Sequence, residues 1–493
     1  MAQDEQTDVR RISLLQPRPF VIASPIALVL DRMSEKAAKF MQRLISADVL
    51  VIGGGTAGFG AAFAAASQGA RVRLIEGTSK IGGVMAFCPG MPWGGGFPIG
   101  RSIGGVFEAL TTQLCTMQPP QAEIRPSSLE NFGLEVLYDH EAAVFAMFQM
   151  LEDVSVEIHL NTFAGSPALE GNRIRAVECY DRAGPLTIEA GIVIDCSGDG
   201  DISAKAGVPF VVGDGRGNMM GVTLSFSMLN APWEKVFASG DPYFQHEAEA
   251  GIAQGRLHPD LSKLYLMRGF HRDTVFCNSV HIRGVDGTDP QQVTKATQEG
   301  RRRCHQLARF LADCVPGFEH ARMSELGPTV GVRETRKLEA VHRILAEELM
   351  AATKFEDGIV CCDNPIDDVM RTDAEMTHDA IVAQGDYYTI PFQSMVPQTV
   401  ENLLFAGRLV CADPAAFASV RGMPQCMAMG QAAGTAAALA LAKGSPVQAL
   451  DHGEIVSTLV AQGVTGIGGK RLSDHAADLR PALPERPGEV ISG

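Results

Sequence analysis

Apolar residues along this chain fall into short runs separated by segments with helical spacing. Two runs of strand length, 48–52 and 71–75, flank an alanine-rich segment, and two more lie at 191–195 and 402–407. Apolar residues three and four apart predict a helix at 140–151. Because strands that alternate with helices indicate a parallel sheet, the expected fold class is α/β.

The same pattern predicts further elements. We expect a strand at 154–160, strands of a small sheet at 173–179 and 186–190, irregular backbone at 89–100, and helices at 289–314, 334–352 and 425–441. Pro424 precedes the last helix, where its fixed φ suits a first turn. Residues 432–442 of that helix are apolar but too few to cross a bilayer, which favours a buried helix.

A glycine-rich turn joins the first strand to the first helix, in the sequence Val51-Ile52-Gly53-Gly54-Gly55-Thr56-Ala57-Gly58. Gly53 permits a tight turn, Gly55 lets the backbone approach a pyrophosphate, and Gly58 lets the helix pack on the strand. Free N–H groups at the helix start then bind the anion. Glu76 ends the second strand, where an acidic residue binds the ribose. The unit predicts a dinucleotide site in a Rossmann-like domain.

Composition excludes several classes of protein. The chain has 493 residues, enough for two connected domains, and a formal net charge of −15, which disfavours nucleic acid as a partner. Its 11 cysteines form no C-x-x-C pair, so we expect neither an iron–sulfur cluster nor a zinc or other metal site. Scattered thiols fit a reducing compartment, so the expected localisation is cytoplasmic.

The first residues allow a second interpretation of localisation. Arg10-Arg11 precedes an apolar stretch at 20–30, which a twin-arginine export signal would also show. That stretch is too short for a membrane span and has no small-residue cleavage site before Asp31. An extension that packs on the domain or mediates oligomer contacts is therefore preferred over export.

Four blocks of sequence together resemble the FAD-dependent oxidoreductases of the two-dinucleotide-binding-domain superfamily, to which flavoproteins like glutathione reductase and fumarate reductase belong. The blocks are the Gly53–Glu76 unit with Gly82-Gly83, Ile194–Asp201, Gly331–Arg336 and Asn402–Gly434. The resemblance covers residues 47–442. It implies a Rossmann-like FAD-binding domain with a parallel sheet at 48–210 and 397–445 and an inserted α+β substrate domain at 211–396, between an extension at 1–47 and a tail at 446–493.

By this resemblance FAD lies extended across the first domain, with its adenosine at Glu76 and its ring at the turn Arg421-Gly422-Met423. The amino end of the helix that follows would stabilise negative charge on the reduced ring. The expected cofactor-binding residues are Gly53, Gly55, Thr56, Ala57, Gly58, Glu76, Gly77, Gly82, Gly83, Ser197, Gly198, Asp199, Gly407, Arg408, Gly422 and Met423.

The chain departs from the family pattern in two blocks. The His-Glu pair and the glycine usual before Ser-x-Arg are absent from Asp413–Arg421, and the usual Tyr-x-Ile-Pro-Tyr-Arg reads Tyr388-Thr389-Ile390-Pro391-Phe392-Gln393. Loss of that arginine weakens the inference of a carboxylate substrate. The Gly82–Met85 loop holds no histidine where some relatives attach flavin, so noncovalent FAD is expected.

Four residues are candidates for catalysis: Arg333, Arg336, Tyr388 and Arg421. The first two would bind an anion or donate to developing charge, unless they form an ion network on a helix surface. Tyr388 would relay a proton, unless it and Tyr387 only pack, and Arg421 would neutralise the flavin or hold substrate, unless it bonds the carbonyls of its turn. Weaker candidates for the base are His271, His281 and His378.

The leading hypothesis is a FAD-dependent oxidoreductase that transfers a hydride between a small organic substrate and flavin, by oxidation, desaturation or alkene reduction. The sequence shows no second glycine fingerprint for a nicotinamide domain, so oxygen, a quinone or a partner protein would exchange electrons. The alternatives are a flavin monooxygenase and a noncatalytic flavoprotein that relays electrons. A homodimer is expected from base rates alone.

Overall fold

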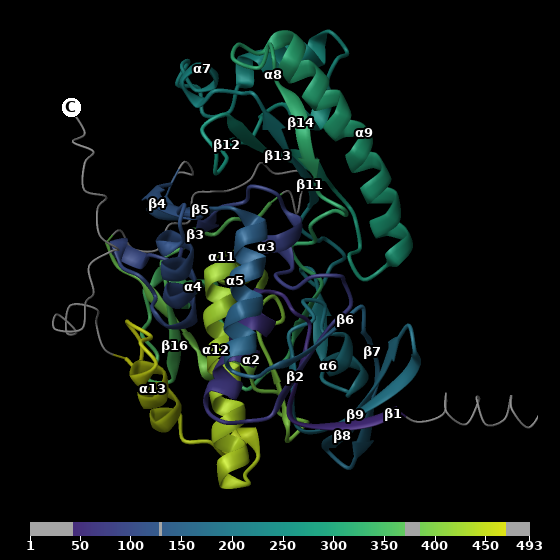
Figure 1. The fold of residues 1–493 in the computed structure, drawn as a ribbon, viewed down its shortest axis with the longest axis vertical. Coiled ribbons are helices and arrows are strands. Elements are labelled where there is room, and N and C mark those ends of the chain that lie inside the picture. Colours follow the sequence, from purple (N-terminus) through teal and green to yellow (C-terminus); the bar gives the residue numbers. More distant parts are fainter. Residues whose placement is uncertain (1–42, 128–130, 370–384, 470–493) are drawn as a thin grey trace, which may run out of the picture. The chain divides into compact units, whose positions relative to one another are not determined.

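The computed structural model describes residues 43–127, 131–369 and 385–469. The chain divides into a unit at Met1–Arg43 and a second unit at Leu44–Gly493, and the described fold is that of the second unit (Figure 1). Most of the predicted N-terminal extension, the predicted tail from residue 470 onward and His378 lie outside the described residues.

A seven-stranded sheet forms the base of the fold. Its strands are β1 (Arg43–Ile52), β2 (Val72–Glu76), β6 (Glu157–Leu160), β7 (Phe163–Glu170), β8 (Arg173–Asp181), β9 (Gly184–Asp195) and β18 (Leu403–Phe405). They follow the order β6-β2-β1-β9-β8-β7, with β18 paired to β9. Parallel registers such as Val51 with Leu74 and Phe405 with Asp195 confirm the predicted parallel sheet and the return of the chain to it near residue 403.

The predicted strands at 173–179 and 186–190 are confirmed within β8 and β9, but the prediction that they form a small sheet is wrong. Both segments belong to the main sheet, because β9 continues without a break from Gly184 to Asp195. Gly191 lies where the strand passes close to β1, and a Cβ there would lie 2.8 Å from the carbonyl oxygen of Asp48. The glycine at the boundary between the two predicted runs 186–190 and 191–195 therefore marks a close approach within one longer strand.

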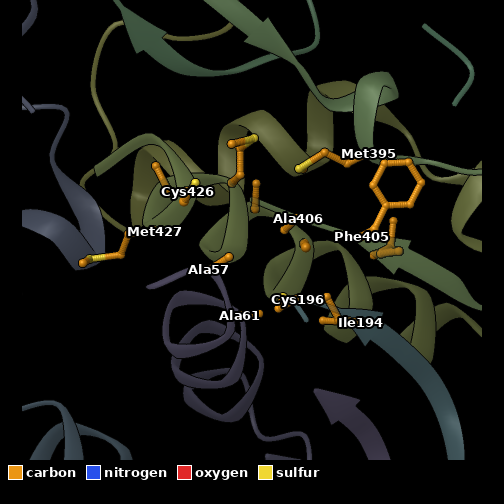
Figure 2. Close-up of a cluster of buried hydrophobic side chains, with 14 of the residues drawn as sticks. Ala57, Ala61, Ile194, Cys196, Met395, Phe405, Ala406, Cys426 and Met427 are labelled. Atoms are coloured by element: carbon orange, nitrogen blue, oxygen red, sulfur yellow. The ribbon is translucent and has the colours of Figure 1, made fainter. Parts of the chain in front are cut away.

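Two helices pack against each other on this sheet, α2 (Thr56–Ser67) and α12 (Met423–Lys443) (Figure 1). Their backbones nearly touch, since a Cβ on Gly430 would lie 1.9 Å from the carbonyl oxygen of Ala57. Figure 2 shows Ala57 and Ala61 of α2 beside Cys426 and Met427 of α12. The predicted buried helix at 425–441 is confirmed.

Smaller elements surround these helices. They are α3 (Val84–Phe87), β3 (Trp93–Gly94), η1 (Pro98–Gly100), α4 (Gly105–Thr116), β4 (Ala122–Pro126), β5 (Leu134–Tyr138), α5 (His140–Asp153), α6 (Asp201–Lys205), β16 (Gly358–Cys362), β17 (Tyr388–Pro391), η3 (Phe392–Met395), α11 (Pro414–Val420), η4 (Val447–Ala449) and α13 (His452–Ala461). The predicted helix at 140–151 is confirmed as α5, and the predicted strand at 154–160 forms only from Glu157.

A second sheet lies in the middle of the chain, with the order β12-β13-β11-β14. The strands are β11 (Val222–Leu229), β12 (Leu266–Arg268), β13 (Thr274–Ile282) and β14 (Arg322–Leu326), accompanied by α7 (Trp233–Val236), α8 (Gln245–Ala253), η2 (Pro259–Leu261) and α9 (Pro290–Cys314). The long helix α9, predicted at 289–314, covers one face of this sheet (Figure 1). The second sheet and α9 share a hydrophobic core of their own. The boundaries 211–396 of a separate substrate domain stay a prediction.

The predicted helix at 334–352 is wrong. Residues Arg336–Leu338 form β15, which pairs with β10 (Phe210–Val212), and only Ala346–Met350 form a short helix, α10. Lys337 donates to Glu334 at 3.1 Å in the protein interior. Charged residues that resemble a solvated helix face are thus buried as an ion pair, and strand pairing overrides local propensity.

No helix among the described residues is long and apolar enough to span a membrane. The predicted localisation stays a prediction.

Candidate functional site

The glycine turn between β1 and α2 adopts the geometry that the motif predicts. Gly53 has φ +95°, and a Cβ on it would lie 2.5 Å from the carbonyl oxygen of Cys196. A Cβ on Gly58 would lie 1.8 Å from the carbonyl oxygen of Gly53. Around Gly55, in contrast, nothing lies within 4 Å of a Cβ position. Two glycines close the turn, and the third leaves open space beside the helix start.

The amino end of α2 has no side-chain cap among the described residues. Gly55 at the N-cap supplies no side chain, and the first turn, which begins with the buried Thr56 and Ala57, holds no acidic residue. Uncapped N–H groups and the helix dipole favour an anion at this position. The space beside Gly55 is therefore suited to the pyrophosphate of a dinucleotide.

Glu76 lies next to this turn at the end of β2. Its carboxylate accepts hydrogen bonds from the Gly54 N–H at 2.7 Å and the Thr78 N–H at 2.8 Å, which orient it and leave lone pairs on both oxygens. The Gly82 N–H donates to the Gly54 carbonyl at 2.7 Å, and a Cβ on Gly83 would lie 3.1 Å from the Gly55 Cα. Glu76, Gly82 and Gly83 thus come together at one turn, with Gly77 held against Phe163.

The turn after β9 forms the next part of the site. Oδ1 of Asp199 accepts a hydrogen bond from Thr335 Oγ1 at 3.0 Å. The same oxygen forms an ion pair with Nη2 of Arg408 at 3.4 Å. A Cβ on Gly198 would lie 2.6 Å from Nη2 of Arg408. Ser197 closes the turn by accepting from the Gly200 N–H at 3.0 Å. Residues 197–199 and 407–408, far apart in sequence, therefore meet.

Arg336 belongs to this part of the site. Its Nη1 donates to the Asp199 carbonyl and to Asp201, both at 2.8 Å. Arg336 lies on strand β15, so the alternative that it and Arg333 form an ion network on a helix surface is wrong about the helix, although Arg336 does form an ion pair with Asp201. The structure connects Arg336 to the turn at Asp199, and its catalytic role stays a prediction.

The amino end of α12 brings positive charge to the same region. Gly422 at its N-cap supplies no side-chain cap, and Met423 begins the helix. Burial raises the pKa of Cys426 in the first turn to about 12, and the nearby charges of Arg408 and Arg421 oppose this rise. Arg421 itself donates to the carbonyl and carboxylate of Asp367 at 2.9 and 3.1 Å. Two arginines thus flank an uncapped helix end.

Tyr388 is enclosed in a hydrogen-bonded network. Its hydroxyl lies 3.1 Å from the Cys362 sulfur and 2.7 Å from Oγ of Ser419. Burial raises its pKa well above 10, so the phenol is neutral at ordinary pH. Tyr387 packs under the ammonium of Lys354. These contacts give Tyr388 a structural use, while a proton relay through it stays a prediction.

Arg333 lies on the polar face of the second sheet. Its Nη1 donates to the Gly221 carbonyl at 2.6 Å and to Thr223 Oγ1 at 2.5 Å, and Thr223 lies 2.6 Å from Nδ1 of His281. Burial and then Arg421 lower the pKa of Arg333 to about 10, against the charge of Asp367. Arg333 and Arg421 are thus electrostatic neighbours, which joins the second sheet to the α12 turn.

Sequence reasoning missed Thr223 and Ser225, which with Cys88 complete this face. Cys88 lies 2.9 Å from Ser225 Oγ, and burial raises its pKa to about 11. The signal was present, because polar residues at 223, 225 and 227 alternate with apolar ones along β11. Among the weaker histidine candidates, His281 is buried on this face and His271 is exposed at a turn.

The arrangement fits FAD. The open space at Gly55 and the start of α2 suit its pyrophosphate, the oriented carboxylate of Glu76 suits its ribose, and the start of α12 suits its ring. Arg408 also has a buried Nη1 without a partner among the described residues. An extended dinucleotide with an electron-accepting ring supplies groups of the right charge for each position.

Comparison with known families agrees with this geometry. A family model described as FAD dependent oxidoreductase matches residues 48–459. The chain belongs to this family. Its cofactor is FAD, and the protein is a FAD-dependent oxidoreductase.

Individual relatives of this FAD-dependent oxidoreductase are distant. A 4-oxocyclohex-2-ene-1-carboxylate 5-dehydrogenase of Sinomonas cyclohexanicum is 39% identical over 77 residues, which is 16% of this chain and only 13% of that protein's length. A flavoprotein/dehydrogenase from Cytophaga hutchinsonii is 14% identical, with a TM-score of 0.45 over 84% of this chain and 82% of its own. A p-nitrophenol 4-monooxygenase from Pseudomonas putida DLL-E4 is 13% identical, with a TM-score of 0.45 over 89% and 92%. Similarity at this level does not discriminate between reactions.

Proposed function

We propose that this oxidoreductase exchanges a hydride between a small organic substrate and noncovalently bound FAD. The flavin supplies the two-electron chemistry, so the chain has to bind it, place the substrate carbon and move one proton. Gly53, Gly55 and Gly58 with Glu76 would hold the dinucleotide, and Gly407, Arg408, Gly422 and Met423 would hold its ribityl and ring.

The observation that carries the proposal is the positive charge around the α12 amino end. An uncapped helix start between Arg408 and Arg421 favours negative charge on a ring bound there, and a two-electron-reduced ring carries such charge. The substrate would lie between this end and the polar face of the second sheet, where Arg333 is held. This arrangement would therefore assist a reaction in which the flavin ring gains negative charge by accepting a hydride.

The direction of the reaction is part of the proposal. The curated relative carries the name of a dehydrogenase, which favours oxidation or desaturation over alkene reduction. The relative is matched over a small part of its length, so this preference concerns direction alone. Oxygen, a quinone or a partner protein would take the electrons.

Anaerobic spectroscopy of the purified holoenzyme tests the proposal. Oxidised flavin bands are followed while amines, hydroxy acids, sugars and enoates are added one class at a time. Bleaching by one class identifies the donor, and recovery of the bands in the prereduced enzyme identifies an acceptor. Reduction by dithionite with no response to any substrate would indicate an electron relay instead, and NADPH-driven oxygen uptake with hydroxylation would indicate a monooxygenase.

A further inference from the structure

The guanidinium of Arg333 is held at one end and open at the other. Its two hydrogen bonds to described residues, to the Gly221 carbonyl and to Thr223 Oγ1, both use Nη1, and an Nη1 group has two hydrogens. Within the described part of the chain, no hydrogen bond or ion pair uses Nε or Nη2. Neither of these two atoms is among the fully enclosed ones that lack a partner. The Nε–Nη2 edge is therefore unengaged and accessible.

The position of that edge is fixed by the second sheet. Thr223 pairs through its backbone with Gly331, two residues before Arg333, with N–O distances of 3.1 and 2.7 Å. Its side chain accepts from Arg333, because an arginine only donates, so its hydroxyl hydrogen is free to donate to Nδ1 of His281. Burial first, and then the charges of Arg333 and Arg283, lower the pKa of His281 well below 6.5, so the ring is neutral and Nδ1 accepts this bond in the tautomer that carries its proton on Nε2. A chain of three side chains thus orients the guanidinium.

Charge at this position calls for an anion. Arg421 lies near enough to repel Arg333, and Asp367, the acidic neighbour that offsets it, is already bonded to Arg421. Two partly buried guanidinium groups attract a negative group more strongly than fully exposed ones do. The Nε–Nη2 edge presents two parallel N–H groups, which match the two oxygens of a carboxylate.

From this geometry we infer that the substrate carries a carboxylate, which binds the Nε–Nη2 edge of Arg333, and that Thr223 and His281 are the positioning residues of that edge. This inference rests on the proposed function for the role of the ligand as substrate. Arg333 would then provide, beside the second sheet, the positive charge that related proteins have at the position of Gln393.

Ligand binding to the FAD-loaded protein tests the inference without turnover. Benzoate and crotonate are titrated against benzamide and crotonamide, pairs of similar shape that differ in charge, with the absorption of the bound oxidised flavin and the thermal midpoint as readouts. We expect the carboxylates to bind roughly 10- to 100-fold more tightly than the amides, the range of a charge-assisted pair.

Variants assign the preference to the edge. Arg333→Met should abolish the difference between carboxylate and amide, and Arg333→Lys, which keeps the charge without the fork, should retain a part of it. Arg301→Met is the matched control, because Arg301 on α9 also donates to backbone carbonyls, those of Gly327 and Pro328, and should leave the preference unchanged. FAD content and the thermal midpoint establish that each variant is folded.

The outcomes separate the inference from the proposed function. Equal binding of carboxylates and amides, no carboxylate binding by either readout, or a preference that survives in Arg333→Met would overturn the inference even in an enzyme that turns over neutral substrates. Carboxylate binding in a protein whose flavin responds to no donor or acceptor would support the binding site and overturn the proposed function.

Discussion

At the scale of single residues, the site depends on partners that fix one orientation of a charged group. Arg333, Thr223 and His281 form a chain of short hydrogen bonds, with 2.5 and 2.6 Å between successive atoms. Arg408 is held against Gly198 and Asp199 in a similar way. In each case one terminal nitrogen of the guanidinium is held by neighbouring residues, Nη1 in Arg333 and Nη2 in Arg408. Substitution of those neighbours should therefore change ligand binding by changing the orientation of the arginine.

Substitution of Thr223 tests this dependence. In Thr223→Val the acceptor of Arg333 is lost while the shape of the side chain is kept, so we expect the affinity of the holoenzyme for benzoate to fall about 3- to 10-fold. Thr223→Ser retains the hydroxyl and should stay close to the wild type. The dissociation constants come from flavin absorption titrations at equal FAD content. Equal loss in both variants would assign the effect to packing instead.

His281 predicts a pH dependence of stability. Its pKa is lowered in the folded protein relative to 6.5, so the unfolded chain binds the proton first as the pH falls. The free energy of unfolding should therefore decrease below about pH 6.5, by up to about 1.4 kcal/mol per pH unit until the folded pKa is reached. Thermal midpoints of the wild type and His281→Gln between pH 7.5 and 5, roughly the range around that ordinary pKa, measure the effect. The variant should lose less stability, and parallel curves would contradict the assignment.

At the scale of elements, the predicted and observed folds agree where the sequence signal is local. The turn from Gly53 to Gly58 and the helices α5, α9 and α12 follow from residues within one segment, so they could be predicted. The segment 334–352 could not, because its strand depends on pairing with β10, over a hundred residues earlier. The contact of Thr223 with His281 depends in the same way on the register of β11 and β13.

Gly55 at the N-cap of α2 and Gly430 within α12 separate ligand binding from folding. Gly55→Ala adds a methyl group where the protein has open space and where φ is −67°, so we expect a thermal midpoint of the apoprotein within a few degrees of the wild type but much weaker FAD binding. Gly430→Ala places a methyl group 1.9 Å from the Ala57 carbonyl and should destabilise the apoprotein by about 1 to 3 kcal/mol.

Thermal shift and FAD titration of both variants distinguish these expectations. If Gly55→Ala lowered the midpoint of the apoprotein as much as Gly430→Ala, the open space at Gly55 would not be a ligand site.

At the scale of the whole molecule, FAD joins segments that the sequence separates. Its expected contacts come from 53–58, 76–83, 197–199, 407–408 and 421–423, which follow β1, β2, β9 and β18 or lead into α12. The identity of the cofactor could be predicted because each segment carries its own motif. The substrate could not, because its expected surface is assembled from two sheets with no motif of their own.

Linkage between FAD and folding follows from this arrangement. A ligand that binds only the folded protein stabilises it by about 2.7 kcal/mol at one hundred times its dissociation constant. The thermal midpoint of the apoprotein should therefore rise as FAD is added and continue to rise with the logarithm of its concentration. Calorimetry of apoprotein with FAD, and with AMP as a ligand for the adenosine part alone, measures this. A thermal midpoint that does not change with FAD concentration would contradict the proposed FAD-binding residues.

The two faces of β11 have a consequence for how such an enzyme can change over time. Val222, Leu224, Phe226 and Met228 belong to the core under α9, whereas Thr223, Ser225 and Ser227 point to the opposite face. Under the proposed function, replacements at the odd-numbered positions would alter what the protein recognises, whereas those at the even-numbered positions would alter whether the sheet folds. Substrate preference would then diverge among descendants of this chain, one alternate position at a time, with the core under α9 left unchanged.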